Sequence, residues 1–288
     1  MMRDKIMGKY VMIDGGVGTS LWEKTDDKKP VWTFNFTHPE LVKELANEMV
    51  EAGAEIVLAN TFSANRPSVE HENFDHSVTE IVTKAMELCK EAVAGRAKCA
   101  LGIGPLTGMI EPFGNIKKEE AAEYFREMIE AGVNAGCDTI YLQTFMDLEM
   151  LKIAAAEAAK FDKPLYCSMS FTKYNPKKGG RTMFGNTPKQ IAEELAQFNP
   201  VAIGLNCSSG PDEALPIIKE FSEVTDLPLI FKPNAGMPSA EGGSEFDYNT
   251  FAEDVAKASE YPGVTYFGGC CGANAKYIAA LKAKLSEK

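Results

Sequence analysis

Three cysteines in two glycine-containing segments are the side chains of this 288-residue chain best suited to catalysis. Cys270 and Cys271 are adjacent within residues 267–272 (FGGCCG), and Cys207 lies within residues 204–208 (GLNCS). Successive side chains of a strand point to opposite faces, so two adjacent cysteines reach one ion only where the backbone leaves the strand, which flanking glycines permit. Three distant thiolates leave the fourth position of a tetrahedral zinc ion open, unlike the closed site of a zinc finger. The pattern therefore predicts a catalytic zinc held by these three residues.

Two other interpretations of the cysteines stay open: three ordinary core residues, or a disulfide between Cys270 and Cys271. Metal coordination ionises a cysteine thiol, whose ordinary pKa is about 8.5. Three thiolates make Zn²⁺ a mild Lewis acid that keeps a fourth sulfur nucleophilic, whereas hydrolytic zinc sites prefer neutral histidine ligands. A site of this kind favours alkylation of a thiol over hydrolysis.

The composition and charge narrow the class of protein. Hydrophobic residues make up 45% and charged residues 25%, as in an ordinary globular domain. A net charge of −11 disfavours nucleic acids and anionic membranes as partners. Seven cysteines, an odd number, predict a reducing compartment, and no apolar leader or membrane-spanning run is present. We expect a cytoplasmic protein with no nucleic-acid or membrane partner.

Short apolar segments alternate with amphipathic segments of helical length along the chain. Strands are expected at 11–14, 56–60, 98–102, 139–143, 165–170, 202–206, 229–232 and 264–268. Helices are expected at 39–52, 79–94, 117–131, 147–159, 187–197, 211–224, 248–258 and 275–285. Eight such units predict a closed α/β (β/α)8 TIM barrel forming one domain over residues 1–288. Long polar loops are expected at 19–38, 172–186 and 235–247, and in a barrel such loops surround the active-site mouth.

The residues that end the predicted strands are nearly all polar or small. They are Asp14, Asn60, Gly104, Gln143, Ser170, Asn206 with Cys207, Asn234, and Cys270 with Cys271. General turn statistics explain part of this pattern but not the cysteines. The series therefore predicts a catalytic rim.

Two further features suggest a chemistry that the surrounding residues do not support. Residues 14–19 (DGGVGT) lack both the Lys-Ser/Thr pair of a Walker loop and the dinucleotide spacing, so we expect this loop to approach a small polar ligand instead. The three histidines, His38, His71 and His76, are not expected to bind the metal, and residues 71–76 are expected to form a solvated loop.

Taken together, these motifs resemble the zinc-dependent homocysteine S-methyltransferases, and are most similar to the homocysteine module of cobalamin-dependent methionine synthase. The resemblance covers almost the whole chain, through residues 14–19, 59–62 (ANTF), 104–105 (GP), 111–112 (EP), 204–208, 233–236 (PNAG) and 268–272. It implies a barrel with Cys207, Cys270 and Cys271 as the zinc ligands. The substrate-binding residues that it implies, with Asp14 holding the amino group of the substrate, are Asp14, Gly15, Asn60, Thr61, Gln143, Asn206 and Asn234.

Two departures from the family pattern affect the expected reaction. Gln143-Thr144 stands where the family has glutamate before threonine, so either Asp14 alone holds a substrate ammonium or the substrate has none. The chain also contains one barrel and no cobalamin domain, so a corrinoid is expected on a separate protein. The expected function is transfer of a methyl group from that protein to a thiol, with homocysteine preferred, in methionine biosynthesis. The alternatives are transfer from a small methylated ether, thioether or amine to Co(I), and a non-enzymatic zinc-dependent binding barrel.

Overall fold

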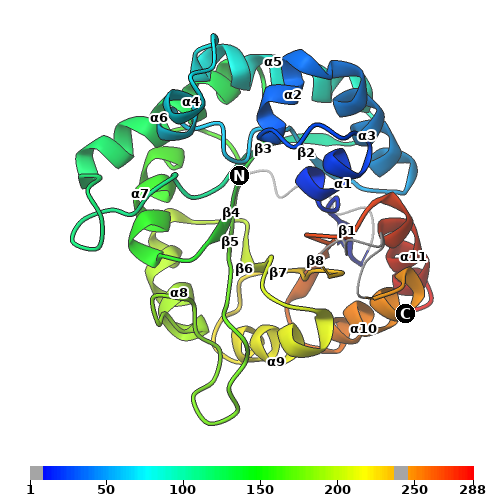
Figure 1. The fold of residues 1–288 in the computed structure, drawn as a ribbon. Helices are drawn as coiled ribbons and strands as arrows, with labels where there is room; N and C mark the ends of the chain where they lie inside the picture. Colours follow the sequence, from blue (N-terminus) through cyan, green and yellow to red (C-terminus); the bar gives the residue numbers. More distant parts are fainter. Residues whose placement is uncertain (1–8, 237–245) are drawn as a thin grey trace.

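A ring of eight parallel strands enclosed by helices forms the centre of the molecule (Figure 1). The computed structural model describes residues 9–236 and 246–288. Neighbouring strands follow the order β1-β8-β7-β6-β5-β4-β3-β2, and a parallel bridge between Ile13 and Ile56 joins the two ends. The strands are β1 (Val11–Met12), β2 (Ile56–Leu58), β3 (Lys98–Ile103), β4 (Thr139–Phe145), β5 (Leu165–Met169), β6 (Ala202–Asn206), β7 (Leu229–Lys232) and β8 (Val264–Phe267). The predicted (β/α)8 barrel is confirmed.

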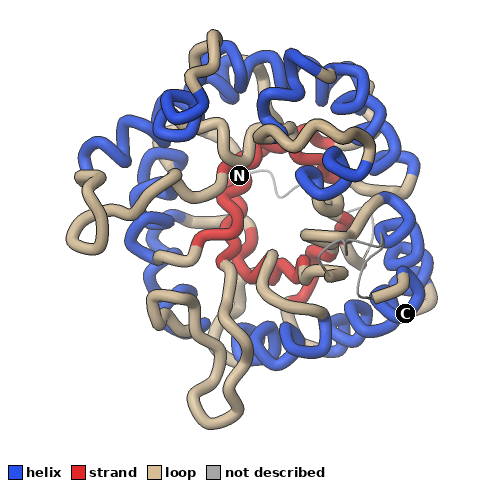
Figure 2. Tube along the Cα trace, in the orientation of Figure 1, coloured by secondary structure: helices blue, strands red, loops and turns tan. Residues whose placement is uncertain are grey.

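The main helices pack around the outside of the ring, as the tube in Figure 2 shows, and each of them follows one of the strands. They are α3 (Pro39–Glu51), α5 (Val78–Val93), α6 (Lys118–Asn134), α7 (Leu148–Ala158), α8 (Pro188–Leu195), α9 (Pro211–Ser222), α10 (Tyr248–Ala256) and α11 (Ala275–Ser286). Short 3-10 turns, η2 (Ala196–Phe198) and η3 (Lys257–Glu260), extend α8 and α10. Capping boxes at Ser77 and Thr187 fix the starts of α5 and α8 by satisfying their first N–H groups. No helix among the described residues is long and apolar enough to cross a membrane.

Short helices occupy two segments for which the sequence predicts loops. The segment after β1 contains α1 (Val17–Glu23), η1 (Val31–Thr33) and α2 (Phe34–Thr37), so the loop predicted at 19–38 is wrong. Helix α4 (Arg66–Glu72) carries an exposed His71, so a loop at 71–76 is wrong at its start. Such short helices show little periodicity, and burial of their few apolar residues stabilises them instead.

Long loops follow several strands at the C-terminal side of the ring. The loop after β5 is present as predicted, whereas most of the loop predicted at 235–247 lies outside the described residues. A further long loop at 104–117 follows β3 and was not predicted; a bridge between Ile110 and Ile116 joins its two arms. These loops surround the ends of the strands, where the candidate site lies.

Two apolar clusters fill the barrel. The larger lies between strands and helices, and the smaller, called the inner core here, lies inside the ring. The inner core consists of Val11, Ile13, Ile56, Leu58, Ala100, Tyr141, Tyr166, Ala202, Ile230 and Tyr266. Side chains alternate along each strand, so on β7 Lys232 continues the inward row begun by Ile230.

Candidate active site

The three predicted zinc ligands meet at the C-terminal mouth of the barrel. The sulfur atoms of Cys207, Cys270 and Cys271 all lie within 4.8 Å of one another, with 3.3 Å between Cys207 Sγ and Cys271 Sγ. A tetrahedral zinc ion with Zn–S bonds of about 2.3 Å places its sulfur ligands about 3.8 Å apart, so the cluster fits one such ion. All three residues are partly exposed, which leaves the cluster accessible from the mouth.

The backbone turns sharply where Cys207 leaves its strand. Cys207 directly follows β6 and has φ of 51°, a left-handed conformation that few non-glycine residues adopt. Ser170 Oγ donates to the Cys207 carbonyl at 2.7 Å and holds this turn. Strain of this kind persists where the surrounding structure enforces it, which is common at functional sites.

Hydrogen bonds among the three thiols shift the pKa values of Cys270 and Cys207 in opposite directions. Bonds from Cys207 and Cys271, and after them the charge of Lys232 and the amide of Asn206, hold the pKa of Cys270 well below its usual range. The bond to Cys270, then the bond to Cys271, raises the pKa of Cys207. The protein therefore favours a thiolate at Cys270 first, which is the form that binds metal.

The glycine loop after β1 supports the cysteine loop by close backbone contact. A Cβ atom on Gly15 would lie 2.0 Å from the carbonyl oxygen of Ala273, and one on Gly16 would lie 2.4 Å from that of Cys270. Thr19 Oγ1 accepts a hydrogen bond from Gly272 N at 3.1 Å. The predicted ligand loop thus packs against the backbone that carries two of the cysteines.

Asn206 links the cysteine cluster to β4 and β5. This fully buried residue ends β6, and its Nδ2 donates to Thr144 Oγ1 at 2.7 Å and to Cys270 Sγ at 3.6 Å. Its Oδ1 accepts from Thr144 N at 2.8 Å and from Ser168 Oγ at 2.6 Å. Ser168 Oγ in turn lies 3.0 Å from Tyr141 Oη inside the ring. The network fixes the orientation of one cysteine, as partners of metal ligands commonly do.

Asn234 holds Cys271, the second of the two adjacent cysteines, through a hydrogen bond to its backbone. Its Oδ1 accepts a hydrogen bond from Cys271 N at 3.1 Å. The backbone of the same segment pairs with the cysteine loop, since Ala235 N donates to the Cys271 carbonyl at 2.8 Å. Asn206, at the end of β6, and Asn234, in the loop after β7, therefore position the two adjacent cysteines.

Comparison with known proteins agrees with this geometry. The family model described as homocysteine S-methyltransferase matches residues 11–285. The chain belongs to the homocysteine S-methyltransferase family. Among solved structures it is similar to the oxidized and metallated forms of the homocysteine methyltransferase MmuM from Escherichia coli. Their TM-score is 0.78 at 20% and 19% identity, with 96% of this chain and 97% of each of those chains covered.

A more distant likeness is to the carboxyl transferase domain of Rhizobium etli pyruvate carboxylase. The TM-score is 0.57 at 12% identity, and 98% of this chain and 47% of that chain are covered. At these identities the structural likenesses concern the fold, and the family assignment rests on the matching family model.

Two of the predicted pocket residues in this family member direct their polar atoms into the protein. Asn60 Nδ2 donates to Val31 O at 2.6 Å and to Asn35 Oδ1 at 3.1 Å. Thr61 Oγ1 donates to Gly102 O at 2.7 Å, and both residues are buried. Their hydrogen bonds join the β1 and β2 loops and β3, so a direct contact with substrate stays a prediction.

Asp14 and Gln143 lie in very different polar surroundings. Asp14 is fully buried, with Oδ1 2.9 Å from Lys232 Nζ and Oδ2 accepting from Leu58 N at 2.7 Å. Burial raises the pKa of Asp14, and the charge of Lys232 opposes this effect. Gln143 is 9% exposed, and its amide forms no hydrogen bond with any residue that the structure describes. A Cβ on Gly102 would lie 3.2 Å from Gln143 Nε2.

Lys232, Thr144, Ser168 and Tyr141 belong to the site and were not predicted. Thr144 has φ of 64°, and the register between β4 and β5 shifts beside it. The side-chain period of two places Lys232 in line with Ile230, and this signal in the sequence could have identified it. Nothing in the sequence marks Thr144 as a turn, because a β-branched residue rarely adopts positive φ.

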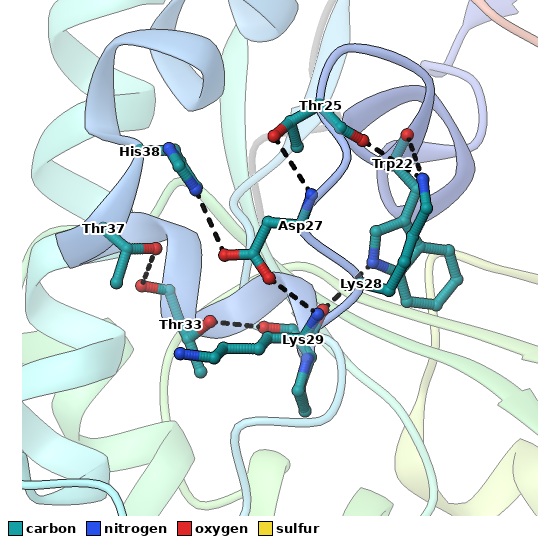
Figure 3. A network of polar contacts seen from close by, with 9 residues as sticks. Trp22, Thr25, Asp27, Lys28, Lys29, Thr33, Thr37 and His38 are labelled. Atoms are coloured by element: carbon teal, nitrogen blue, oxygen red, sulfur yellow. Dashed lines mark hydrogen bonds and ion pairs between the residues drawn. The ribbon is translucent and has the colours of Figure 1, made fainter.

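The histidines stand apart from the cysteine cluster, as the sequence predicts. Figure 3 shows His38 with Asp27 in the segment between α1 and α3, where His38 Nε2 lies 3.2 Å from Asp27 Oδ2. His76 stacks on Phe36 with ring centroids 3.8 Å apart. The one group of potential metal ligands among residues 9–236 and 246–288 is the cysteine triad.

Proposed function

We propose that this protein is a zinc-dependent methyltransferase that activates a small-molecule thiol. The observation that carries the proposal is the gathering of three cysteine sulfurs at the barrel mouth with the spacing of one tetrahedral ion. No fourth cysteine, histidine or carboxylate in the described part of the chain joins them, so a fourth ligand position is available to substrate.

The residues around the cluster support this chemistry. Bound zinc would supply the Lewis acidity that ionises a substrate thiol at neutral pH. Cys207, Cys270 and Cys271 would hold the ion, while Asn206 and Asn234 fix the directions of two of these ligands. The substrate sulfur would form a bond to the methyl carbon, the bond from that carbon to the donor would break with its electron pair leaving on the donor, and the thiol proton would pass to solvent.

The proposed acceptor and donor follow from family membership. Homocysteine, the thiol in the name of the family, is the reference acceptor, which would place the enzyme in methionine biosynthesis. We propose a methyl-corrinoid carried by a separate cytoplasmic protein as donor, with residues 1–288 acting as one domain. The seven free cysteines are compatible with a reducing compartment.

A second candidate is transfer of a methyl group from a small methylated ether, thioether or amine to Co(I) of a corrinoid protein. The neutral amide of Gln143 favours it, because such donors need no carboxylate to bind an ammonium group. Consumption of these donors by the zinc-loaded enzyme and a reduced corrinoid protein, with no methylation of any thiol, would select this candidate.

The test of the first candidate combines metal content with turnover. We expect one zinc per chain and methylation of homocysteine by a methylated corrinoid protein, both lost in Cys207→Ala. Cys137→Ala is the matched control, because Cys137 is buried just before β4 at the opposite end of the ring. Full retention of zinc in Cys207→Ala would refute the metal assignment.

A further inference from the structure

Most of the exposed large apolar side chains lie at the mouth of the barrel. Eight such side chains are exposed in the described part of the chain, and seven of them belong to segments that follow the C-terminal ends of strands: Trp22, Phe62, Met109, Phe113, Met146, Met183 and Tyr248. The eighth, Val224, lies at the opposite end of the barrel, between α9 and β7. Apolar side chains that gather on one face without cover are typical of a surface that contacts another molecule.

The loops after β3 and β5 carry the most exposed members of this group. Met183 is 69% exposed, Phe113 66% and Met109 49%. The ring of Phe113 meets that of Phe184, on the other loop, edge to face with centroids 5.5 Å apart. We call these four side chains the β3–β5 patch. Both loops reach beyond the ring of helices (Figures 1 and 2), so the patch is a projecting surface and not a pocket that encloses a small molecule.

The loop after β5 also concentrates positive charge. Residues 172–186 contain three lysines, one arginine and no acidic residue, whereas the whole chain has a net charge of −11. Lys173 pairs with Glu213 at 2.7 Å, but Lys177 and Lys178 are exposed at the tip of the loop and form no ion pair with any described residue. An acidic surface is repelled by the chain as a whole and attracted by this loop, which determines where and in which orientation it binds.

Contacts with α9 hold the loop after β5 in this shape. Glu220 accepts hydrogen bonds from Gly180 N at 3.0 Å and from Tyr174 Oη at 3.2 Å. At the base of the loop, Thr172 N donates to Arg181 O at 2.9 Å. A loop that is already ordered loses less conformational entropy when it binds a partner. The loop therefore presents its apolar and basic side chains on a preformed surface.

We propose that the β3–β5 patch and the two tip lysines dock an acidic face of the protein that carries the methyl donor. The inference rests on the proposed function, in which the donor belongs to a separate protein and its methyl group must reach the cysteine cluster. That cluster lies at the same end of the barrel as the patch, and its three cysteines are partly exposed. Methionine and aromatic side chains are enriched in protein interfaces, and charged residues lie at their rims.

A comparison of two methyl donors tests this inference. Free methylcobalamin and methylcobalamin bound to a purified acidic corrinoid protein offer the same methyl group, and only the second offers a protein surface. With zinc-loaded enzyme and homocysteine, Phe113→Ser combined with Met183→Ser should lower kcat/KM for the protein-bound donor at least about tenfold, because a few apolar anchors dominate an interface. Turnover of free methylcobalamin should stay within about twofold of wild type, since this donor makes no such contact.

The tip lysines supply a second, independent variant. Lys177→Ala combined with Lys178→Ala should lower the same kcat/KM about threefold and weaken its dependence on salt, because attraction between opposite charges speeds association mainly at low ionic strength. The matched controls lie at the opposite end of the barrel: Val224→Ser for the apolar change, and Lys282→Ala combined with Lys284→Ala for the charge change. Both controls should leave the turnover of both donors unchanged.

Each outcome decides either the inference or the function on which it rests. Loss of turnover with the protein-bound donor alone, in both mouth variants, supports the inference, and a loss in only one of them overturns the part assigned to the other pair of residues. Unchanged kcat/KM in both variants, an equal loss with both donors, or a wild-type enzyme that uses only free methylcobalamin overturns the inference while the thiol chemistry stands. Wild-type enzyme that methylates homocysteine from neither donor overturns the proposed function, and the inference with it.

Discussion

Replacement of Asn206 by alanine should weaken zinc binding and destabilise the barrel by separable amounts. The change leaves a buried donor, Ser168 Oγ, and a partly buried one, Thr144 N, without the acceptor that they have at 2.6 and 2.8 Å. Each unsatisfied buried group costs about 1–3 kcal/mol, and partial relaxation brings the expected loss of unfolding free energy to about 2–4 kcal/mol. Loss of the contact to Cys270 Sγ should weaken zinc binding about 10- to 100-fold, the usual effect of removing a partner of a metal ligand.

The assay compares thermal unfolding of the metal-free protein with competition for zinc against a chromophoric chelator. In a chain of this size the stability loss corresponds to a fall in Tm of roughly 4–8 °C. Asn35→Ala is the control, because Asn35 is equally buried and exchanges hydrogen bonds with Asn60 away from the cysteines. It should lower Tm and leave zinc affinity unchanged. Wild-type zinc affinity in Asn206→Ala, or an equal loss of affinity in Asn35→Ala, would refute the proposed coupling.

Three further predictions concern the metal and the backbone around it. Removal of zinc by a chelator should leave far-ultraviolet circular dichroism and cooperative unfolding intact, because the apolar clusters do not include the metal site; loss of helical signal would contradict this. Thr144→Gly should change the free energy of unfolding little, because relief of backbone strain at φ of 64° offsets the lost hydrogen bond from Asn206. Thr144→Val loses the same hydrogen bond without relieving the strain, so it should cost about 1–2 kcal/mol; a larger loss for glycine than for valine in denaturant titrations would be inconsistent with strain. Gly15→Ala should cost about 1–3 kcal/mol and weaken zinc binding, since its Cβ would lie 2.0 Å from Ala273 O, while Gly18→Ala, with its nearest neighbour at 3.8 Å, should do neither.

The strands were largely predictable from the sequence because the apolar segments end abruptly. β6 and β7 have the predicted bounds, since a polar side chain ends each apolar run, at Asn206 and at Lys232. β4 extends to Phe145, two residues beyond its predicted end. The reason is the irregular pairing with β5 around Thr144, which a pattern of alternating side chains does not reveal.

The cysteines of the candidate site were predictable, whereas the contacts of several neighbours were not. Glycines around Cys270 and Cys271 mark a sharp turn in the sequence itself. Asn60 and Thr61 lie just beyond β2, which ends at Leu58, two residues before its predicted end, and their hydrogen bonds run to Val31, Asn35 and Gly102. Partners of this kind depend on how separate loops pack together, and no local pattern encodes them.

The pairing of Asp14 with Lys232 shows how such a contact alters a prediction made from sequence. The sequence places a carboxylate at the mouth, which suggests a ligand for an ammonium group. Its partner lies 218 positions further along the chain, on β7, which the closed ring places two strands away from β1. An apolar pair of similar volume would stabilise a barrel interior at least as well as an ion pair, because burying two charges carries a large desolvation cost. Packing alone therefore gives no reason to keep this pair, whereas the charge of Lys232 lowers the pKa of Cys270, one of the candidate metal ligands.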